Sequence, residues 1–170
     1  MMTDIFVTIY QMKSENEAKF MPLEFIDKYN LPLQMQDYKV VFQGYIIANE
    51  GIKDEAFCDA IYAMLQSRKI EGFTGHSLSV SDIVSFRDTY YFCDSHSWED
   101  ITSRLPTPIL KKDEKYECLH DYMTDDESIA YTKGVVYQMA NGGNLPDNSK
   151  DKHTMSNERD FYAYFKKVSD

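Results

Sequence analysis

Cysteine, tryptophan and long apolar runs are scarce in this chain, and each shortage excludes a class of protein. The three cysteines, Cys58, Cys93 and Cys118, are odd in number and show no CxxC spacing. They predict free, mostly buried thiols rather than a disulfide framework or a zinc site. No signal peptide and no run of 18 apolar residues is visible, so we expect a soluble cytoplasmic protein that does not bind membranes.

Common catalytic and nucleotide-binding motifs are also missing. The sequence has no GxxxxGK[ST], GxGxxG, HExxH or GxSxG pattern. These absences remove the usual signatures of phosphate-binding loops, dinucleotide sites, zinc proteases and serine hydrolases. We therefore expect no metal site and no resident cofactor.

Basic residues are outnumbered: 18 Lys and Arg stand against 28 Asp and Glu, which gives a net charge of −10. An excess of negative charge argues against general binding to nucleic acid or to anionic membranes. It is compatible with docking on a basic partner, including a partner whose usual ligand is a nucleic acid.

The apolar content of 43% and the aromatic content of 14% indicate a globular, sheet-containing domain. Hydrophobic patterning predicts strands over residues 4–10 and 38–45, and helices over 23–29 and 53–67. The first strand is apolar on both faces, so we place it centrally in its sheet. The acidic residues Asp54, Glu55 and Asp59 lie off the apolar stripe of the second helix and are interpreted as a solvated surface.

A β-hairpin is predicted over residues 82–94, where two short runs rich in β-branched and aromatic residues flank a polar turn. A three-residue loop, Arg87-Asp88-Thr89, would place Asp82 opposite Asp94 at the open end of the hairpin. Facing carboxylates repel and require a shared proton, a cation or separate hydrogen bonds. A shift of register by one residue would separate them.

Two interpretations of this stretch stay open. In the first, Asp82 and Asp94 form an acid and histidine site with His76 and His96, which could move a proton or hold a cation. In the second, the serines and Asp82 bond nearby backbone groups in a structural loop. Ser97 would then cap a short helix that begins at Trp98.

The composition changes after Pro108. A capping box at residues 124–127 predicts a helix over 128–141, and residues 157–167 predict a closing helix or, over 161–165, a last strand. The predicted fold class is α+β: a small, mostly antiparallel sheet with the hairpin at 82–94 packed by helices, plus a mostly helical C-terminal extension. The predicted domains are residues 1–105 and 106–170.

Two segments resemble the YodL-like domains, which are small domains of Firmicutes and of their plasmids, phages and conjugative elements. They are GHSLSVSDIV at residues 75–84 and YFCDS at residues 91–95. The resemblance extends over roughly residues 4–103 and includes Tyr10-Gln11 at the end of the first strand. The family tends to a glycine-aromatic step after Asp-Ser, and His96-Ser97-Trp98 departs from it, so the resemblance does not support a role for His96.

The resemblance implies an anti-defence role, namely inhibition of a type II CRISPR effector nuclease through binding to the effector and its guide RNA. Cleavage of the guide RNA, with Mg²⁺ if the acids hold a metal, is a further alternative. The expected catalytic residues are Asp82, Asp94, His96 and His76, and the expected binding residues are Ser77, Ser79, Tyr91 and Trp98. A non-enzymatic regulator that binds a host protein, such as one of the cell-shape cytoskeleton, is the alternative. The oligomeric state stays open.

Overall fold

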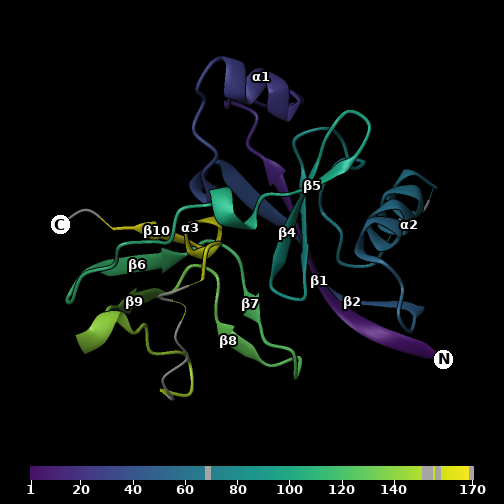
Figure 1. Cartoon of the computed structure of the whole chain (residues 1–170). Coiled ribbons are helices and arrows are strands. Elements are labelled where there is room, and N and C mark those ends of the chain that lie inside the picture. Colours follow the sequence, from purple (N-terminus) through teal and green to yellow (C-terminus); the bar gives the residue numbers. More distant parts are fainter. Residues whose placement is uncertain (68–69, 151–154, 156–157, 169–170) are drawn as a thin grey trace. The chain divides into compact units, whose positions relative to one another are not determined.

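The computed structural model describes residues 1–67, 70–150, 155 and 158–168. The chain divides into two compact units (Figure 1). The first comprises residues 1–33 and 37–104, and the second comprises residues 34–36 and 105–170. The division thus differs from a simple boundary at residue 105, because residues 34–36 group with the second unit.

The first unit is built on a five-stranded sheet with the order β2-β1-β3-β4-β5, in which all neighbouring strands are antiparallel. Its strands are β1 (Met2–Met12), β2 (Tyr38–Asn49), β3 (Ile83–Phe86), β4 (Thr89–Cys93) and β5 (Trp98–Asp100). Its helices are α1 (Leu23–Lys28), α2 (Asp54–Ser67) and the 3-10 turn η2 (Thr102–Arg104), and a further 3-10 turn, η1 (Met35–Asp37), precedes β2.

Strand β1 lies between β2 and β3, which confirms its predicted central position. Six consecutive residues, Val7 to Met12, are buried. Their β-branched and aromatic side chains suit a strand that is covered on both faces. The one amide side chain in this run is Gln11, which is fully buried at the end of the strand.

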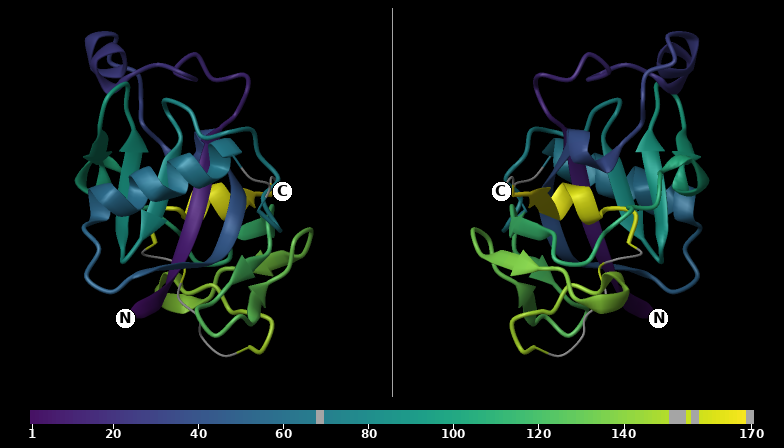
Figure 2. Two further views of the ribbon diagram at one scale, coloured as in Figure 1. Left: turned by 90° about the vertical axis from the view of Figure 1, so that its right-hand side faces the viewer. Right: turned by 90° about the vertical axis from the view of Figure 1, so that its left-hand side faces the viewer.

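Helix α2 covers one face of the sheet (Figure 2). Its apolar stripe, with Phe57, Ile61 and Leu65, packs against β1 and β3 residues such as Ile9 and Val84. This packing confirms the helix predicted from the spacing of its apolar residues. Within the described part of the chain, no helix has the length and apolar character needed to cross a membrane.

The hairpin is present, but its register differs from the prediction. Phe86 pairs with Thr89, and Ile83 pairs with Phe92, so the loop has two residues rather than three. Arg87 and Asp88 both have positive φ, 50° and 59°, as a type I′ turn requires. This turn matches the twist of the flanking strands, although neither residue is a glycine or an asparagine.

The helix predicted to begin at Trp98 is wrong. Residues Trp98–Asp100 form β5, the edge strand that pairs with β4, with Trp98 opposite Cys93. A tight turn joins the two strands, in which the Asp94 amide donates to the Ser97 carbonyl at 3.0 Å. Ser97 therefore belongs to a turn and does not cap a helix.

The described part of the second unit has more strand than helix, so the predicted mostly helical C-terminal extension is wrong. Its two antiparallel sheets have the orders β10-β6-β9 and β7-β8. The strands are β6 (Lys115–Cys118), β7 (Tyr122–Met123), β8 (Ile129–Tyr131), β9 (Val136–Gln138) and β10 (Phe165–Lys167). The helical segments are the 3-10 turn η3 (Asn141–Gly143) and the short helix α3 (Phe161–Tyr164).

The helix predicted over residues 128–141 is replaced by β8 and β9. Gly134 has a φ of 81° between these strands, and this backbone conformation stops a helix. The closing segment is both helix and strand: α3 has four residues and β10 follows at once. Asn157, where the closing helix was predicted to begin, lies outside the described residues. The α+β class therefore holds in the broad sense, with sheet predominating over helix.

Burial predicts unreactive cysteines. Cys58, Cys93 and Cys118 are free and at most 5% exposed. Burial raises the pKa of Cys93 to about 12 and that of Cys118 to about 11, and it raises the pKa of Cys58 further. Because the thiolate is the reactive form, Ellman's reagent should titrate all three thiols in urea but react slowly with the native protein. Rapid modification of one native thiol would contradict this packing.

Candidate functional site

The hairpin register separates the two aspartates that were predicted to face each other. Asp82 is paired with Cys93: the Cys93 amide donates to the Asp82 carbonyl at 2.8 Å, and the Ser81 amide donates to the Cys93 carbonyl at 2.9 Å. Asp94 therefore lies one residue beyond the partner of Asp82. The physical reason is the two-residue turn, because one residue fewer in the loop shifts every pair along the hairpin.

The Asp82 carboxylate is enclosed in the protein and only 1% of the residue is exposed. Its Oδ2 accepts hydrogen bonds from Gln11 Nε2 at 3.0 Å and from the Ser79 amide at 2.9 Å. Burial raises the pKa of Asp82 to about 7, against the opposing effect of these two hydrogen bonds. Asp82 thus holds a loop in place and is closed to a substrate.

Gln11 is the centre of this arrangement. Its Oε1 accepts from the His76 amide at 3.1 Å, and its Nε2 donates to the His76 carbonyl at 2.8 Å as well as to Asp82. The side chain thereby bonds the loop backbone much as a neighbouring strand would. A Cβ on Gly75 would lie 2.3 Å from Gln11 Oε1, so this close approach requires glycine.

The remaining serine-rich loop is tied to several elements. The Ser81 carbonyl accepts from Tyr38 Oη at 3.1 Å, and Ser81 Oγ accepts from the Phe20 amide at 2.9 Å. The Leu78 carbonyl accepts from Gln66 Nε2 of α2 at 2.8 Å. Residues 75–82, which we name the brace loop, therefore join β1, β2, α2 and the segment before α1.

Three of the predicted site residues are used within the brace loop itself. Ser79 Oγ donates to the Ser77 carbonyl at 3.1 Å. His76 is exposed, and its Nδ1 lies 2.7 Å from the same Ser77 carbonyl and 3.1 Å from Gln11 Nε2. These contacts are the local side-chain to backbone bonds that stabilise turns.

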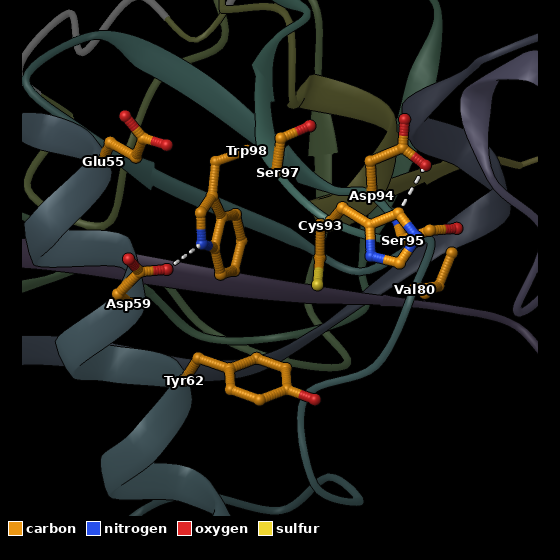
Figure 3. Close-up of a pocket in the computed structure, with 10 residues that line it drawn as sticks. Glu55, Asp59, Tyr62, Val80, Cys93, Asp94, Ser95, Ser97 and Trp98 are labelled. Carbon is orange, nitrogen blue, oxygen red and sulfur yellow. Dashed lines mark hydrogen bonds between the residues drawn. The ribbon is translucent and has the colours of Figure 1, made fainter.

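Asp94 and His96 lie instead in a separate pocket of about 280 Å³ between α2 and the turn before β5 (Figure 3). We name it the acidic pocket. Its lining comprises Glu55, Asp59 and Tyr62 of α2, Val80, Cys93, the turn residues Asp94, Ser95, His96 and Ser97, and Trp98. The structure thus brings Asp94, His96 and Trp98 together and leaves Asp82 and His76 to the brace loop.

Fixed hydrogen bonds shape the acidic pocket. Trp98 Nε1 donates to Asp59 Oδ1 at 3.0 Å, which joins β5 to α2. The Tyr62 ring meets the indole edge-on, with ring centroids 6.4 Å apart. Asp94 Oδ1 accepts from the Ser95 amide at 2.8 Å and from the Leu23 amide at 3.3 Å. The walls are therefore positioned before any ligand arrives.

Tyr91, a predicted binding residue, does not line this pocket. Its hydroxyl donates to Asp54 Oδ2 at 2.6 Å, and Arg87 of the hairpin turn bonds Asp54 Oδ1 at 2.7 Å. Tyr91 and Arg87 therefore attach the hairpin to the first turn of α2. Desolvation of the half-buried Tyr91 raises its pKa, and the hydrogen bond to Asp54 adds to the shift.

A metal site would need several His, Cys, Asp or Glu side chains gathered at one place. In the described ranges, no group of three or more His, Cys, Asp or Glu side chains is placed to hold a metal ion.

Glu55 and Asp59, which supply two of the pocket's carboxylates, were missed as site residues. A Trp paired with a distant Asp leaves no local signal, because 39 residues separate the two partners.

The raised pKa of Asp82 predicts a pH dependence of stability. Between its unfolded value near 4 and its folded value of about 7, the folded state binds a proton that the unfolded state does not. The free energy of unfolding should therefore fall as pH rises through this window, by on the order of 2–4 kcal/mol, and level off above it. In Asp82→Asn, which keeps an acceptor but cannot titrate, this dependence should disappear.

Urea unfolding at several pH values between 4 and 8 measures this difference. The pKa of Asp37 is also raised by burial, but that contribution is common to both proteins and cancels in the comparison. Identical pH profiles for the two proteins would show that Asp82 does not titrate as described.

The contact of Gly75 with Gln11 predicts a coupled pair. Gly75→Ala should lower the free energy of unfolding by roughly 2–4 kcal/mol, because Gln11 is buried and its hydrogen bonds prevent it from moving aside. In a Gln11→Ala background the same change should cost less, with a coupling energy of about 0.5–3 kcal/mol. Additive costs in the double-mutant cycle would mean that the two residues do not interact.

Comparison with known proteins identifies the family of the first unit. A family model, the YodL-like domain, matches residues 6–103. The match begins within β1, includes the brace loop, the hairpin and the residues of the acidic pocket, and ends within η2. The chain matches no curated protein and no solved structure. The chain therefore belongs to the YodL-like domain family.

Proposed function

We propose that the chain is a non-enzymatic inhibitor that binds the basic, nucleic-acid-binding surface of a defence effector. The target class that we propose is the type II CRISPR effector nuclease with its guide RNA. The observation that carries this proposal is the acidic pocket, whose three carboxylates, Glu55, Asp59 and Asp94, surround aromatic rings at the surface.

Charge supports a basic protein partner. The net charge is −10, and the ion pairs among the described residues include Arg87–Asp54, Arg104–Asp27 and Lys167–Glu114. None of them involves a carboxylate of the acidic pocket. A channel that holds a guide-RNA heteroduplex must be positively charged. Complementary charges increase the association rate and select against partners of the wrong sign.

The positions of the four predicted catalytic residues favour binding over catalysis. Asp82 is buried with its carboxylate already hydrogen-bonded, and His76 bonds the brace loop. Of the four, only Asp94 and His96 share a pocket, and Asp94 Oδ1 accepts hydrogen bonds from two backbone amides there. A general base must reach the proton that it removes, and Asp82 is too enclosed to do so.

The proposal predicts a stable complex with intact RNA. The protein should co-elute with an effector loaded with labelled guide RNA, and the RNA should keep its length with and without Mg²⁺. Glu55→Lys should weaken the complex about tenfold, because it places a cation in the acidic pocket. Size-exclusion chromatography and gel electrophoresis of the RNA measure both results.

The matched control is Glu50→Lys, an exposed residue beside β2 that changes the net charge equally. Equal weakening by both substitutions would show that only net charge matters. RNA shortening that is lost in Asp94→Ala would instead establish a nuclease. Altered cell morphology on expression without any CRISPR system would favour the alternative, a regulator of the cell-shape cytoskeleton.

A further inference from the structure

The acidic pocket has the size of a side-chain site. Its volume of about 280 Å³ lies below the range of roughly 300–1,000 Å³ typical of small-molecule sites. It is formed at the edge of the sheet, where β5 is the last strand. A partner's surface can approach there and insert one long side chain.

Trp98 presents a fixed aromatic surface in this pocket. Its one polar group, Nε1–H, is used by Asp59, so the indole is held in one orientation. Figure 3 shows Glu55 and Asp59 on one side of the indole and Cys93 and Asp94 on the other. A cation over an indole face is attracted by the negative potential of the ring, and Trp is the best side chain for this contact.

The surrounding charges are of one sign. Glu55 and Asp59 lie one turn apart on α2, and both are exposed. Neighbouring Asp54 differs, because Arg87 and Tyr91 bond its two oxygens. In the part of the chain that the structure describes, no Lys or Arg lines the pocket. A cation is therefore the ligand that complements these walls.

We infer that the acidic pocket receives an arginine side chain of the protein partner, with its guanidinium stacked on Trp98 and hydrogen-bonded to Glu55 and the free edge of Asp59. Arginine fits better than lysine because a planar guanidinium both stacks on an aromatic ring and bonds a carboxylate through two N–H groups. This inference rests on the proposed function, since it names the residue by which a basic partner is held.

The inference can be tested without the effector, because Trp98 is the only tryptophan and its fluorescence reports on the pocket. The probes are acetyl-Gly-Arg-Gly-Arg-Gly-amide and its lysine and citrulline counterparts. The arginine peptide should change the fluorescence saturably, with a Kd about five- to tenfold lower than that of the lysine peptide. The citrulline peptide, which lacks the charge, should give no saturable change.

Matched variants assign the effect to the pocket. Glu55→Gln should raise the Kd of the arginine peptide at least about threefold, and Glu50→Gln should leave it within about twofold. Circular dichroism checks that each variant is folded. Equal Kd values for arginine and lysine peptides, or equal effects of the two variants, would overturn the inference.

The arginine pocket and the proposed function can fail separately, because the peptide titration tests the first and the effector complex tests the second. Saturable, arginine-selective binding with no effector complex would retain the arginine pocket and overturn the CRISPR target. An effector complex that Glu55→Gln leaves unchanged, together with no peptide binding, would overturn the arginine pocket alone.

Discussion

The buried amide of Gln11 is the interaction on which the first unit depends. A side-chain amide that is 0% exposed in a sheet must find partners, because an unsatisfied buried polar group costs on the order of 1–3 kcal/mol. Gln11 finds them in the His76 backbone and in Asp82. Through Asp82 the same contacts position the first pair of the hairpin, Asp82 with Cys93. Cys93 pairs in turn with Trp98, so the geometry of the acidic pocket follows from the bonds of the brace loop.

The elements that the sequence predicts correctly are those whose signal is local. The apolar stripe of α2, the apolar runs of β1 and β2, and the start of α1 after Pro22 are properties of short windows. The hairpin register was missed because Arg87-Asp88 lacks the glycine or asparagine that usually signals a two-residue turn. The second unit was predicted to be helical from the capping box at residues 124–127 and the charges of residues 157–167. Its strands have only two to four residues, too few for a strand period to oppose that prediction.

The sequence predicts which segments contain the candidate site better than it predicts how their side chains are arranged. Sequence reasoning selected the brace loop and the turn at residues 94–98, and both are dense in hydrogen bonds. It could not show that Asp82 faces Gln11, because that contact joins residues 71 positions apart. It also assigned Glu55 and Asp59 to a solvated helix surface, whereas they form a wall of the acidic pocket. The alternative interpretation, in which the serines and Asp82 serve a structural loop, describes the brace loop better than the catalytic one does.

The central claim is that the brace loop is scaffold and the acidic pocket is the binding surface. The most direct measurement is a ¹⁵N–¹H correlation spectrum of the protein during titration with an arginine-rich peptide. It contains a single indole N–H signal, from Trp98, and the side-chain amide signals of Gln11. The account predicts that the Trp98 signal shifts on binding while those of Gln11 stay in place. Movement of the Gln11 amide with an unchanged Trp98 signal would contradict it.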